Sequence, residues 1–263
     1  MAILCILNLA QMRITNMNVG LVFFAYKNDE PLLRLALEAV PRLRAAGDNV
    51  EVFVFDDASA PLSAPPRGVK YQQTHFDRGG NLNGLQCIQG MLEAYARVMA
   101  YGRFSWLIKA DCDTFVNNIE WLRDLDAKST AFAGTIHVND HASGACYALS
   151  REGVAVLQER MLCPSWQGKA SRGYCEDRVF YHMSRLSGLD IAAFRNDANA
   201  LDGPLFHAWL AARRYEPAEL LKAYAVDFKA CRWNSRPEDW EQDAATALER
   251  MTEYCNFIKQ NHG

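Results

Sequence analysis

Two aspartates, two residues apart, are the strongest sign of chemistry in this 263-residue chain. Asp111 and Asp113 follow the apolar residues 106–108, a run typical of a short buried strand. Side chains alternate along an extended segment, so both carboxylates point to the same side, and Lys109 shares their parity. Oxygens at this spacing suit a hard divalent cation that keeps positions open for phosphate oxygens. The pattern therefore predicts a metal site for a phosphorylated ligand, and hence an enzyme.

The elements that must position these residues alternate between strand and helix. Apolar runs predict strands over 19–26 and 50–55, and Asp56 and Asp57 end the second one. A glycine-rich segment then leads into a predicted helix over 85–101. Strands separated by helices imply parallel pairing, and ligands bind at the carboxyl ends of such strands. We expect the acidic residues to meet at one edge of an α/β sheet, although Asp56-Asp57 could equally form a turn and helix cap.

Further along the chain the alternation continues. The pattern predicts helices at 119–126 and 151–161, a strand at 131–137 that the segment 144–150 follows, and a loop containing Gly168. Glu176 and Asp177 open another helix, where carboxylates gain from the helix dipole. A first helix starts near Pro31 and should end at Pro41. An apolar stripe within 239–259 predicts a C-terminal helix that docks on the domain.

Composition limits the possible functions. Half of the residues are hydrophobic, 22% are charged and the net charge is −3, which fits a soluble globular protein and gives no basic excess for nucleic-acid binding. The eight cysteines lack the spacing of a zinc site, so we expect a reducing cytoplasm, although Cys163 and Cys175 could pair in a secreted protein. The apolar N-terminal residues lack a basic region, and Met17 is an alternative start. No segment reaches membrane length, so any membrane association would be peripheral.

Three ordered stretches resemble the motifs of one enzyme family. They are Lys-Ala-Asp-Cys-Asp-Thr-Phe-Val-Asn at 109–117, Gly-Ala-Cys-Tyr-Ala-Leu-Ser-Arg at 144–151 and Glu-Asp-Arg-Val at 176–179. Together they are similar to the fringe and β1,3-galactosyl/N-acetylglucosaminyl-transferase family, over roughly residues 70–190. The resemblance implies the GT-A glycosyltransferase fold, an α/β architecture with a Rossmann-like mixed sheet flanked by helices. The domain would span 17–235, with a helical extension at 236–263 packed on it.

The resemblance also implies how a site would work. The donor would be a UDP-sugar, and Mn²⁺ or Mg²⁺ would bridge its phosphates. Asp113 would bind the metal, with Asp111 near the metal or ribose, and His207 would be a further ligand, with His182 a weaker one. Asp177, or failing that Glu176, would take the proton of the acceptor hydroxyl. The remaining donor-site candidates are Phe24, Ala25, Tyr26, Asp56, Asp57, Asn83, Gly84, Lys109, Gly144 and Ala145.

The sequence departs from the family at Arg178, where an apolar residue is usual, and in lacking a membrane anchor and a disulfide-rich stem. The missing anchor and stem favour a bacterial-type soluble enzyme. The Glu-Asp pair favours inversion at the sugar, while the sequence leaves retention open. The acceptor could be a glycan, a lipid-linked saccharide or a protein, and Trp166, Trp209 and Trp233 could stack on it or pack in the core.

Two other functions fit parts of the same pattern. Asp111-Cys-Asp113-Thr114 also reads as the motif of haloacid-dehalogenase-type phosphatases, with Asp111 as the covalent nucleophile. That motif normally opens its domain, whereas two strand–helix units precede it here. A non-catalytic protein that binds a sugar nucleotide is the third hypothesis.

Overall fold

The computed structural model describes residues 16–45, 47–75, 84–137, 141–172, 175–195, 205–207, 216–228 and 240–262. Its centre is a seven-stranded mixed sheet with the strand order β3-β2-β1-β4-β7-β6-β8. β1 pairs in parallel with both β2 and β4, whereas β7 runs antiparallel to β4 and β6. The strands are β1 (Asn18–Ala25), β2 (Asn49–Asp57), β3 (Lys70–Thr74), β4 (Trp106–Ala110), β6 (Thr130–His137), β7 (His141–Ser150) and β8 (Asp190–Arg195).

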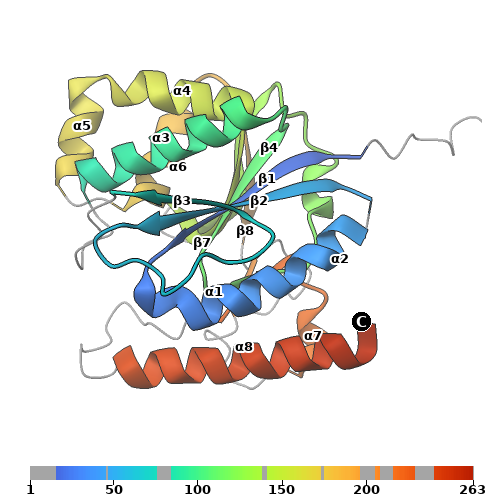
Figure 1. The fold of residues 1–263 in the computed structure, drawn as a ribbon. Coiled ribbons are helices and arrows are strands. Elements are labelled where there is room, and N and C mark those ends of the chain that lie inside the picture. Colours follow the sequence, from blue (N-terminus) through green and yellow to red (C-terminus); the bar gives the residue numbers. More distant parts are fainter. Residues whose placement is uncertain are drawn as a thin grey trace, which may run out of the picture.

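Helices cover both faces of this sheet (Figure 1). The side chains of β1 show why, because they alternate between two cores: Leu21 and Phe23 belong to one, Val22 and Phe24 to the other. The first core includes residues of α1 (Glu30–Ala36), α2 (Val40–Ala45) and α8 (Trp240–His262). The second includes residues of α3 (Leu85–Tyr101), α4 (Arg151–Met161), α5 (Pro164–Ser171) and α6 (Glu176–Arg185).

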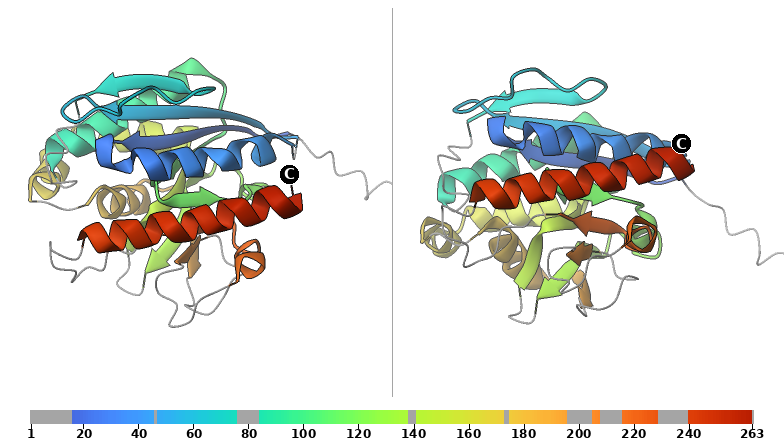
Figure 2. Two further views of the ribbon diagram at one scale, coloured as in Figure 1. Left: turned by 60° about the horizontal axis from the view of Figure 1, so that its bottom comes forward. Right: turned by 90° about the horizontal axis from the view of Figure 1, so that it is seen from below.

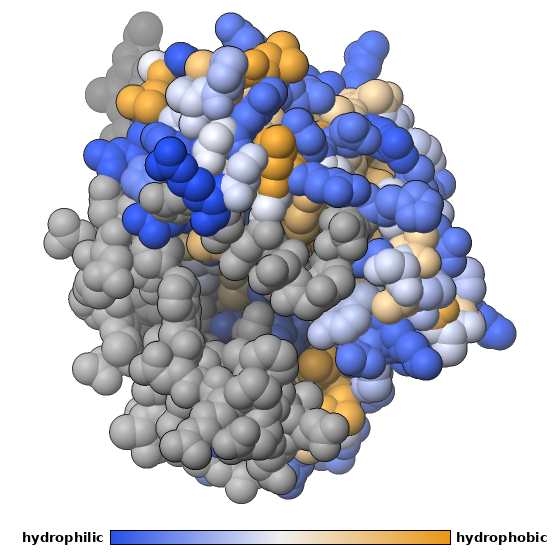
Figure 3. Space-filling model, turned by 90° about the vertical axis from the view of Figure 1, so that its left-hand side faces the viewer, coloured by the Kyte–Doolittle hydropathy of each residue, from blue (hydrophilic) through white to orange (hydrophobic). Residues whose placement is uncertain are grey.

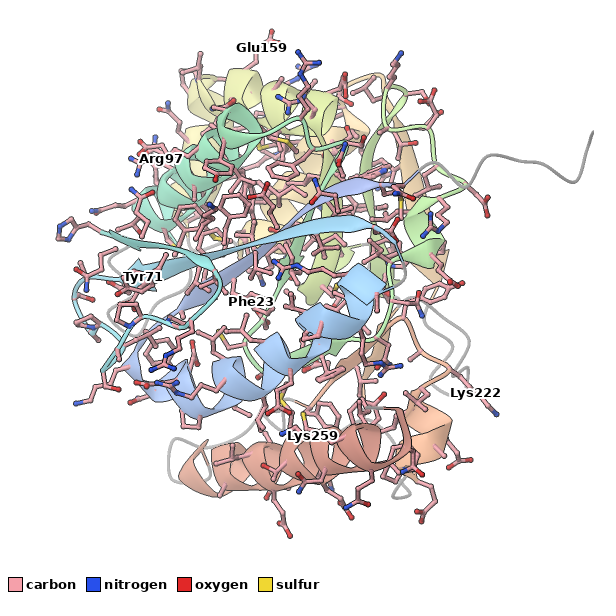
Figure 4. All side chains as sticks on the ribbon, turned by 45° about the vertical axis from the view of Figure 1, so that its right-hand side comes forward. Phe23, Tyr71, Arg97, Glu159, Lys222 and Lys259 are labelled. Carbon is pink, nitrogen blue, oxygen red and sulfur yellow. The ribbon has the colours of Figure 1, made fainter. Side chains whose placement is uncertain are left out.

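The C-terminal helix α8 runs beside α1 and α2 in both views of Figure 2. Met251, Tyr254 and Cys255 are fully buried, as the predicted docking stripe requires. The Tyr254 hydroxyl donates to Asn117 Oδ1 at 2.7 Å, and Lys259 Nζ lies 2.8 Å from Glu38 Oε1 (Figure 4 shows Lys259 between α8 and the N-terminal helices). The helix therefore packs on the domain, while the expected boundary at 235 lies outside the described residues.

A second, three-stranded sheet joins the segment after β4 to the C-terminal part of the chain. It has the order β5-β10-β9, with β5 (Thr114–Val116), β9 (Leu205–His207) and β10 (Ala225–Asp227). The short helix α7 (Pro217–Leu220) precedes β10. Asn117 fixes this junction, because its side-chain amide donates to the carbonyls of Leu220 and Ala223 at 3.0 and 2.8 Å.

Three predicted elements differ from the structure. Residues 119–126 form only a 3-10 turn at Glu120–Leu122, because the Asp126 side chain accepts from the Lys128 amide and its carbonyl from Thr130, which ends any helix there. The predicted loop around Gly168 is the helix α5, which Pro164 opens. Pro41 does not end the first helical region, since it lies in the first turn of α2, where its missing N–H costs nothing.

None of the helices in the described part of the chain has the length and apolar character needed to cross a bilayer. The sequence prediction that no segment reaches membrane length agrees with this finding.

Gly153 tests the packing of α4 on the sheet. A Cβ atom at this position would lie 2.1 Å from the Ala131 carbonyl oxygen of β6, so α4 would have to move. We expect Gly153→Ala to lower the free energy of unfolding by about 1–3 kcal/mol in urea denaturation. Gly168→Ala is the control, because nothing lies within 4 Å of a Cβ there, and alanine should stabilise α5 by up to about 1 kcal/mol. Equal effects of both changes would contradict this packing.

Candidate active site

The candidate site lies at the edge of the sheet where β1, β2 and β4 end. Ala25 pairs with Asp56 and Phe23 with Ala110, so these three carboxyl ends are level with one another. The antiparallel strand β7 brings Gly144 and Ala145 to the same edge, since Cys146 pairs with Ala110. This edge faces the left-hand side of Figure 1, and Figure 3 looks onto that side of the molecule.

Lys109 is the electrostatic centre of this edge. Its side chain is 5% exposed, and its ammonium donates to Asp111 Oδ1 at 2.5 Å and to the Gly144 carbonyl. Glu176 Oε1 lies 3.4 Å from the same nitrogen. Burial alone would lower the pKa of Lys109, but the charges of Asp111 and Glu176 outweigh it and raise that pKa. Lys109 therefore joins β4, β7 and α6. Its role as a donor-site candidate stays a prediction.

Glu176 and Asp177 open α6 beside Gly144 but face different environments. Glu176 is buried, and burial raises the pKa of its carboxyl group, an effect that nearby Lys109 partly offsets. Asp177 is half-exposed, and its Oδ1 accepts from the Arg178 amide at 2.6 Å. A Cβ on Gly144 would lie 2.9 Å from Asp177 Oδ2, so the missing side chain makes room for this carboxylate. Glu176 is buried next to Lys109, whereas Asp177 lies at the surface of the site.

The register of the small sheet brings a further acid and a histidine to Asp113. Asp227 of β10 pairs with Thr114 on one side and with His207 on the other. Asp227 is buried, and its charge, with those of Lys109 and Asp111, acts on the thiol of Cys146, whose pKa burial raises to about 12. Only the backbone of His207 is described. The sequence analysis missed Asp227, although an acid directly after the apolar run 223–226 repeats the pattern seen at Asp111.

The donor-site candidates on β1 and β2 are mostly buried. Both oxygens of Asp56 accept from the Leu62 amide, and Oδ2 also accepts from the Tyr71 hydroxyl at 2.5 Å. Asp57 Oδ1 accepts from the amide and hydroxyl of Ser59, the turn arrangement weighed as the alternative. These contacts fix the turn after β2. A nucleotide-binding role for either acid stays a prediction.

Among the β1 candidates, Phe24 packs against Phe55 and Tyr95, Ala25 is fully buried, and Tyr26 is half-exposed. Only Tyr26 of these three can offer side-chain surface to a ligand. Gly84 lies directly before α3 with a φ of +155°, a conformation that favours glycine. The Ala145 carbonyl accepts from the Asp111 amide at 2.9 Å. Asn83 lies outside the described residues.

The six cysteines of the described residues are free thiols. Cys112, between the two aspartates, is buried, and its thiol donates to the Phe24 carbonyl at 3.5 Å. Residues 111–113 form a turn in which the Thr114 amide donates to the Asp111 carbonyl at 3.0 Å, so the alternation expected of an extended segment does not apply to the two aspartates. Cys163 and Cys175, considered as a disulfide pair, are both free.

The donor types at this edge fit a divalent cation of the magnesium or manganese kind. Asp113 is half-exposed beside Asp111, and hard cations of this size bind one or two carboxylates and leave other positions to phosphates and water. The described residues contain no group of three or more histidine, cysteine, aspartate or glutamate side chains that could hold a metal ion. A site here would thus depend on few protein ligands, to which His207 could add one.

Comparison with solved structures finds the same fold in several glycosyltransferases. The galactosyltransferase LgtC, in complex with donor and acceptor sugar analogs, matches with a TM-score of 0.53 and 14% identity over 90% of this chain and 95% of that one. A glycosyltransferase involved in glycosylation of the major capsid of PBCV-1 gives 0.53 and 10%, over 89% and 98%. The glycosyltransferase GlyE of Streptococcus pneumoniae TIGR4 gives 0.50 and 11%, over 93% and 64%.

These likenesses confirm the predicted fold: the chain has the mixed α/β architecture of GT-A glycosyltransferases. No protein-family profile and no curated protein matches the sequence. The narrower likeness to the fringe family stays a prediction.

Replacing Lys109 by methionine tests the ion cluster. Two carboxylates would lose their cation in a buried setting, so we expect the free energy of unfolding to fall by about 3–5 kcal/mol at pH 7. Without the cation the pKa of Glu176 should rise further, so the penalty should shrink as the pH falls toward the unfolded value of about 4.3. The difference in the free energy of unfolding between wild type and Lys109→Met, measured by urea denaturation, should therefore be smaller at pH 5 than at pH 8.

Lys259→Met is the matched control for this experiment, because the side chain of Lys259 is 60% exposed in its ion pair with Glu38. It should change stability little at either pH. The pKa of Lys109 is raised, so its ammonium group stays charged between pH 5 and 8. The stability that this charge contributes is lost only at alkaline pH. A penalty for Lys109→Met that is independent of pH would contradict the cluster.

Proposed function

We propose that this protein is a metal-dependent glycosyltransferase that moves a hexose or N-acetylhexosamine from a UDP-sugar to a hydroxyl acceptor. The observation that carries the proposal is the meeting of two acidic sets at one edge of a GT-A sheet. Asp111 and Asp113 lie in the turn directly after β4, Asp177 lies in the first turn of α6, and Lys109 bridges the two elements. This edge is where open α/β sheets bind their ligands.

Asp113, with Asp111 beside it, would hold Mn²⁺ or Mg²⁺, which supplies charge neutralisation for the diphosphate leaving group when bound. Lys109 acts as a positioning residue, because it fixes Asp111 at one end and Glu176 at the other. Asp177 would take the proton of the attacking hydroxyl, which needs a carboxylate near the acceptor. With a base on the side opposite the leaving group, the transfer would invert the anomeric centre.

The GT-A fold favours this function over a phosphatase that uses Asp111 as nucleophile. An oxygen of Asp111 already accepts from Lys109 at 2.5 Å, which lowers its readiness to attack phosphorus. A non-catalytic binding role is distinguished by the variants below.

Asp113→Asn should abolish Mn²⁺-dependent binding of UDP, because an amide replaces the charged ligand. A thermal-shift titration with UDP, with and without Mn²⁺, measures this, since a ligand that binds the native state raises its apparent stability. Asp124→Asn is the control, an exposed aspartate in the turn after the 3-10 segment, and should bind as wild type does. Unchanged Mn²⁺-dependent binding in Asp113→Asn would overturn the metal assignment.

Asp177→Asn should keep that binding but lower transfer or donor hydrolysis by about 10²–10⁴-fold, the usual contribution of general base catalysis. Release of UDP from a panel of UDP-sugars is the measurement. A protein that binds UDP and loses nothing in Asp177→Asn would be a binding protein rather than a transferase.

Gly144→Ala gives a milder version of the same test. The new methyl group would overlap Asp177 Oδ2 at 2.9 Å, and the carboxylate can turn aside at little cost in stability. We expect turnover to fall by more than tenfold with an unchanged melting temperature. If turnover and melting temperature both match wild type, the Asp177 carboxylate does not need its observed position.

A further inference from the structure

A groove between α5 and α6 lies outside the residues assigned so far. It encloses about 370 Å³. α5 lies on the left in Figure 1, the side that Figure 3 shows, where strongly hydrophilic residues alternate with hydrophobic ones in the upper part. The lining residues are Trp166, Lys169, Arg178, Val179, His182, Arg185 and Leu186.

The two walls of the groove follow helical periodicity. Arg178, His182 and Arg185 are four and three residues apart on α6, so they share one face of that helix. Trp166 and Lys169 are three apart on α5 and form the opposite wall. Polar and charged side chains from two helices thus converge on one hollow.

Packing holds two of the cations in place. Lys169 Nζ lies 3.9 Å from the centre of the Trp166 ring, and the guanidinium of Arg185 lies 5.7 Å from the ring of Tyr181. Cation–π contacts of this kind restrict long side chains before a ligand arrives, which lowers the entropy cost of binding. Trp166 itself is nearly buried, so it forms a rigid wall.

The charge of the groove has one sign. Three permanent cations line it, and no carboxylate is among the described residues of its wall. Guanidinium groups match the oxygens of a phosphate or carboxylate with two parallel hydrogen bonds. Val179, Leu186 and Trp166 add apolar surface beside the charges, which suits a ring or chain that carries the anion.

The groove begins next to the proposed base, Asp177. Arg178 follows Asp177 directly. At 1.5 Å per helical residue, Arg185 lies about 12 Å from Asp177 along the axis of α6. We propose that the groove is an acceptor subsite for an anionic saccharide, whose phosphate or carboxylate binds Lys169, Arg178 and Arg185 while a hydroxyl reaches Asp177. This subsite rests on the transferase function proposed for Asp113 and Asp177. His182, the weaker candidate for a metal ligand, would belong to this subsite rather than to the metal site.

Equilibrium binding tests the subsite without turnover. Inorganic pyrophosphate is titrated into the full chain by calorimetry, with a chelator present and no donor, so that no metal site contributes. We expect binding that weakens on the order of tenfold in Lys169→Gln and in Arg185→Gln, the loss of one hydrogen bond to a charged group, and disappears in the double variant. Lys222→Gln, an exposed lysine of the segment after α7, should bind as wild type does (Figure 4).

A matched pair of probes then separates charge from shape. p-Nitrophenyl glucuronide and p-nitrophenyl glucoside differ in a carboxylate, so only the glucuronide should bind more tightly to wild type than to the double variant. Pyrophosphate binding that is unchanged in the double variant, or absent in wild type, would overturn the subsite. So would groove-dependent binding to phosphatidylglycerol vesicles without binding of either soluble anion, which would indicate a membrane surface.

The outcome is independent of the transferase test. Asp113→Asn and Asp177→Asn should bind pyrophosphate like wild type, and the double groove variant should keep Mn²⁺-dependent UDP binding. A failed transferase assay with an intact anion site would therefore leave the groove as an anion site and reject only its role for an acceptor.

Discussion

The ammonium group of Lys109 holds together three segments that are distant in the chain. It contacts Asp111 at the end of β4, the Gly144 carbonyl of β7 and Glu176 at the start of α6. A buried lysine is costly unless carboxylates surround it, and the two acids are costly without the lysine, so each requires the others. The position of α6 against the sheet, and with it the position of Asp177, depends on this cluster.

The mixed topology of the sheet is what lets such a cluster form. Parallel strands bring Asp56 and Asp111 to one edge, and the antiparallel β7 returns to that edge with a glycine. The absent side chain of Gly144 leaves room for the Asp177 carboxylate. The small sheet then adds Asp227 and the backbone of His207 beside Thr114. Acids or the residues that support them thus come from β2, β4, β7, α6 and β10.

α6 connects two kinds of surface. Its first two residues are the acids of the site, whereas the cations that line the groove follow from Arg178 to Arg185. The change of sign occurs between Asp177 and Arg178, the residue at which the sequence departs from the motif it otherwise resembles. In the proposed function Asp177 would accept a proton and the cations would bind the anion of the same acceptor, which would give this departure a physical reason.

The sequence by itself determined the fold class and most of the elements near the site. Apolar runs predicted β1, β2 and β4, and the helices at 85–101, 151–161 and from Glu176 are present, because hydrophobic periodicity and helix-end signals are local properties. Local signals failed at 119–126, around Gly168 and at Pro41, where turn contacts or tolerance of proline in a first turn decided the outcome.

Only the tertiary structure decided which charged residues contact one another. Lys109 was a donor-site candidate in the sequence, but Glu176 lies 67 positions away and no spacing could reveal their contact at 3.4 Å. The pairing of β10 with β5 brings Asp227 to the site. The groove forms because α5 and α6 pack side by side. Long-range charge pairing and packing between elements depend on the whole chain, which is why these features lay beyond the reach of pattern and spacing.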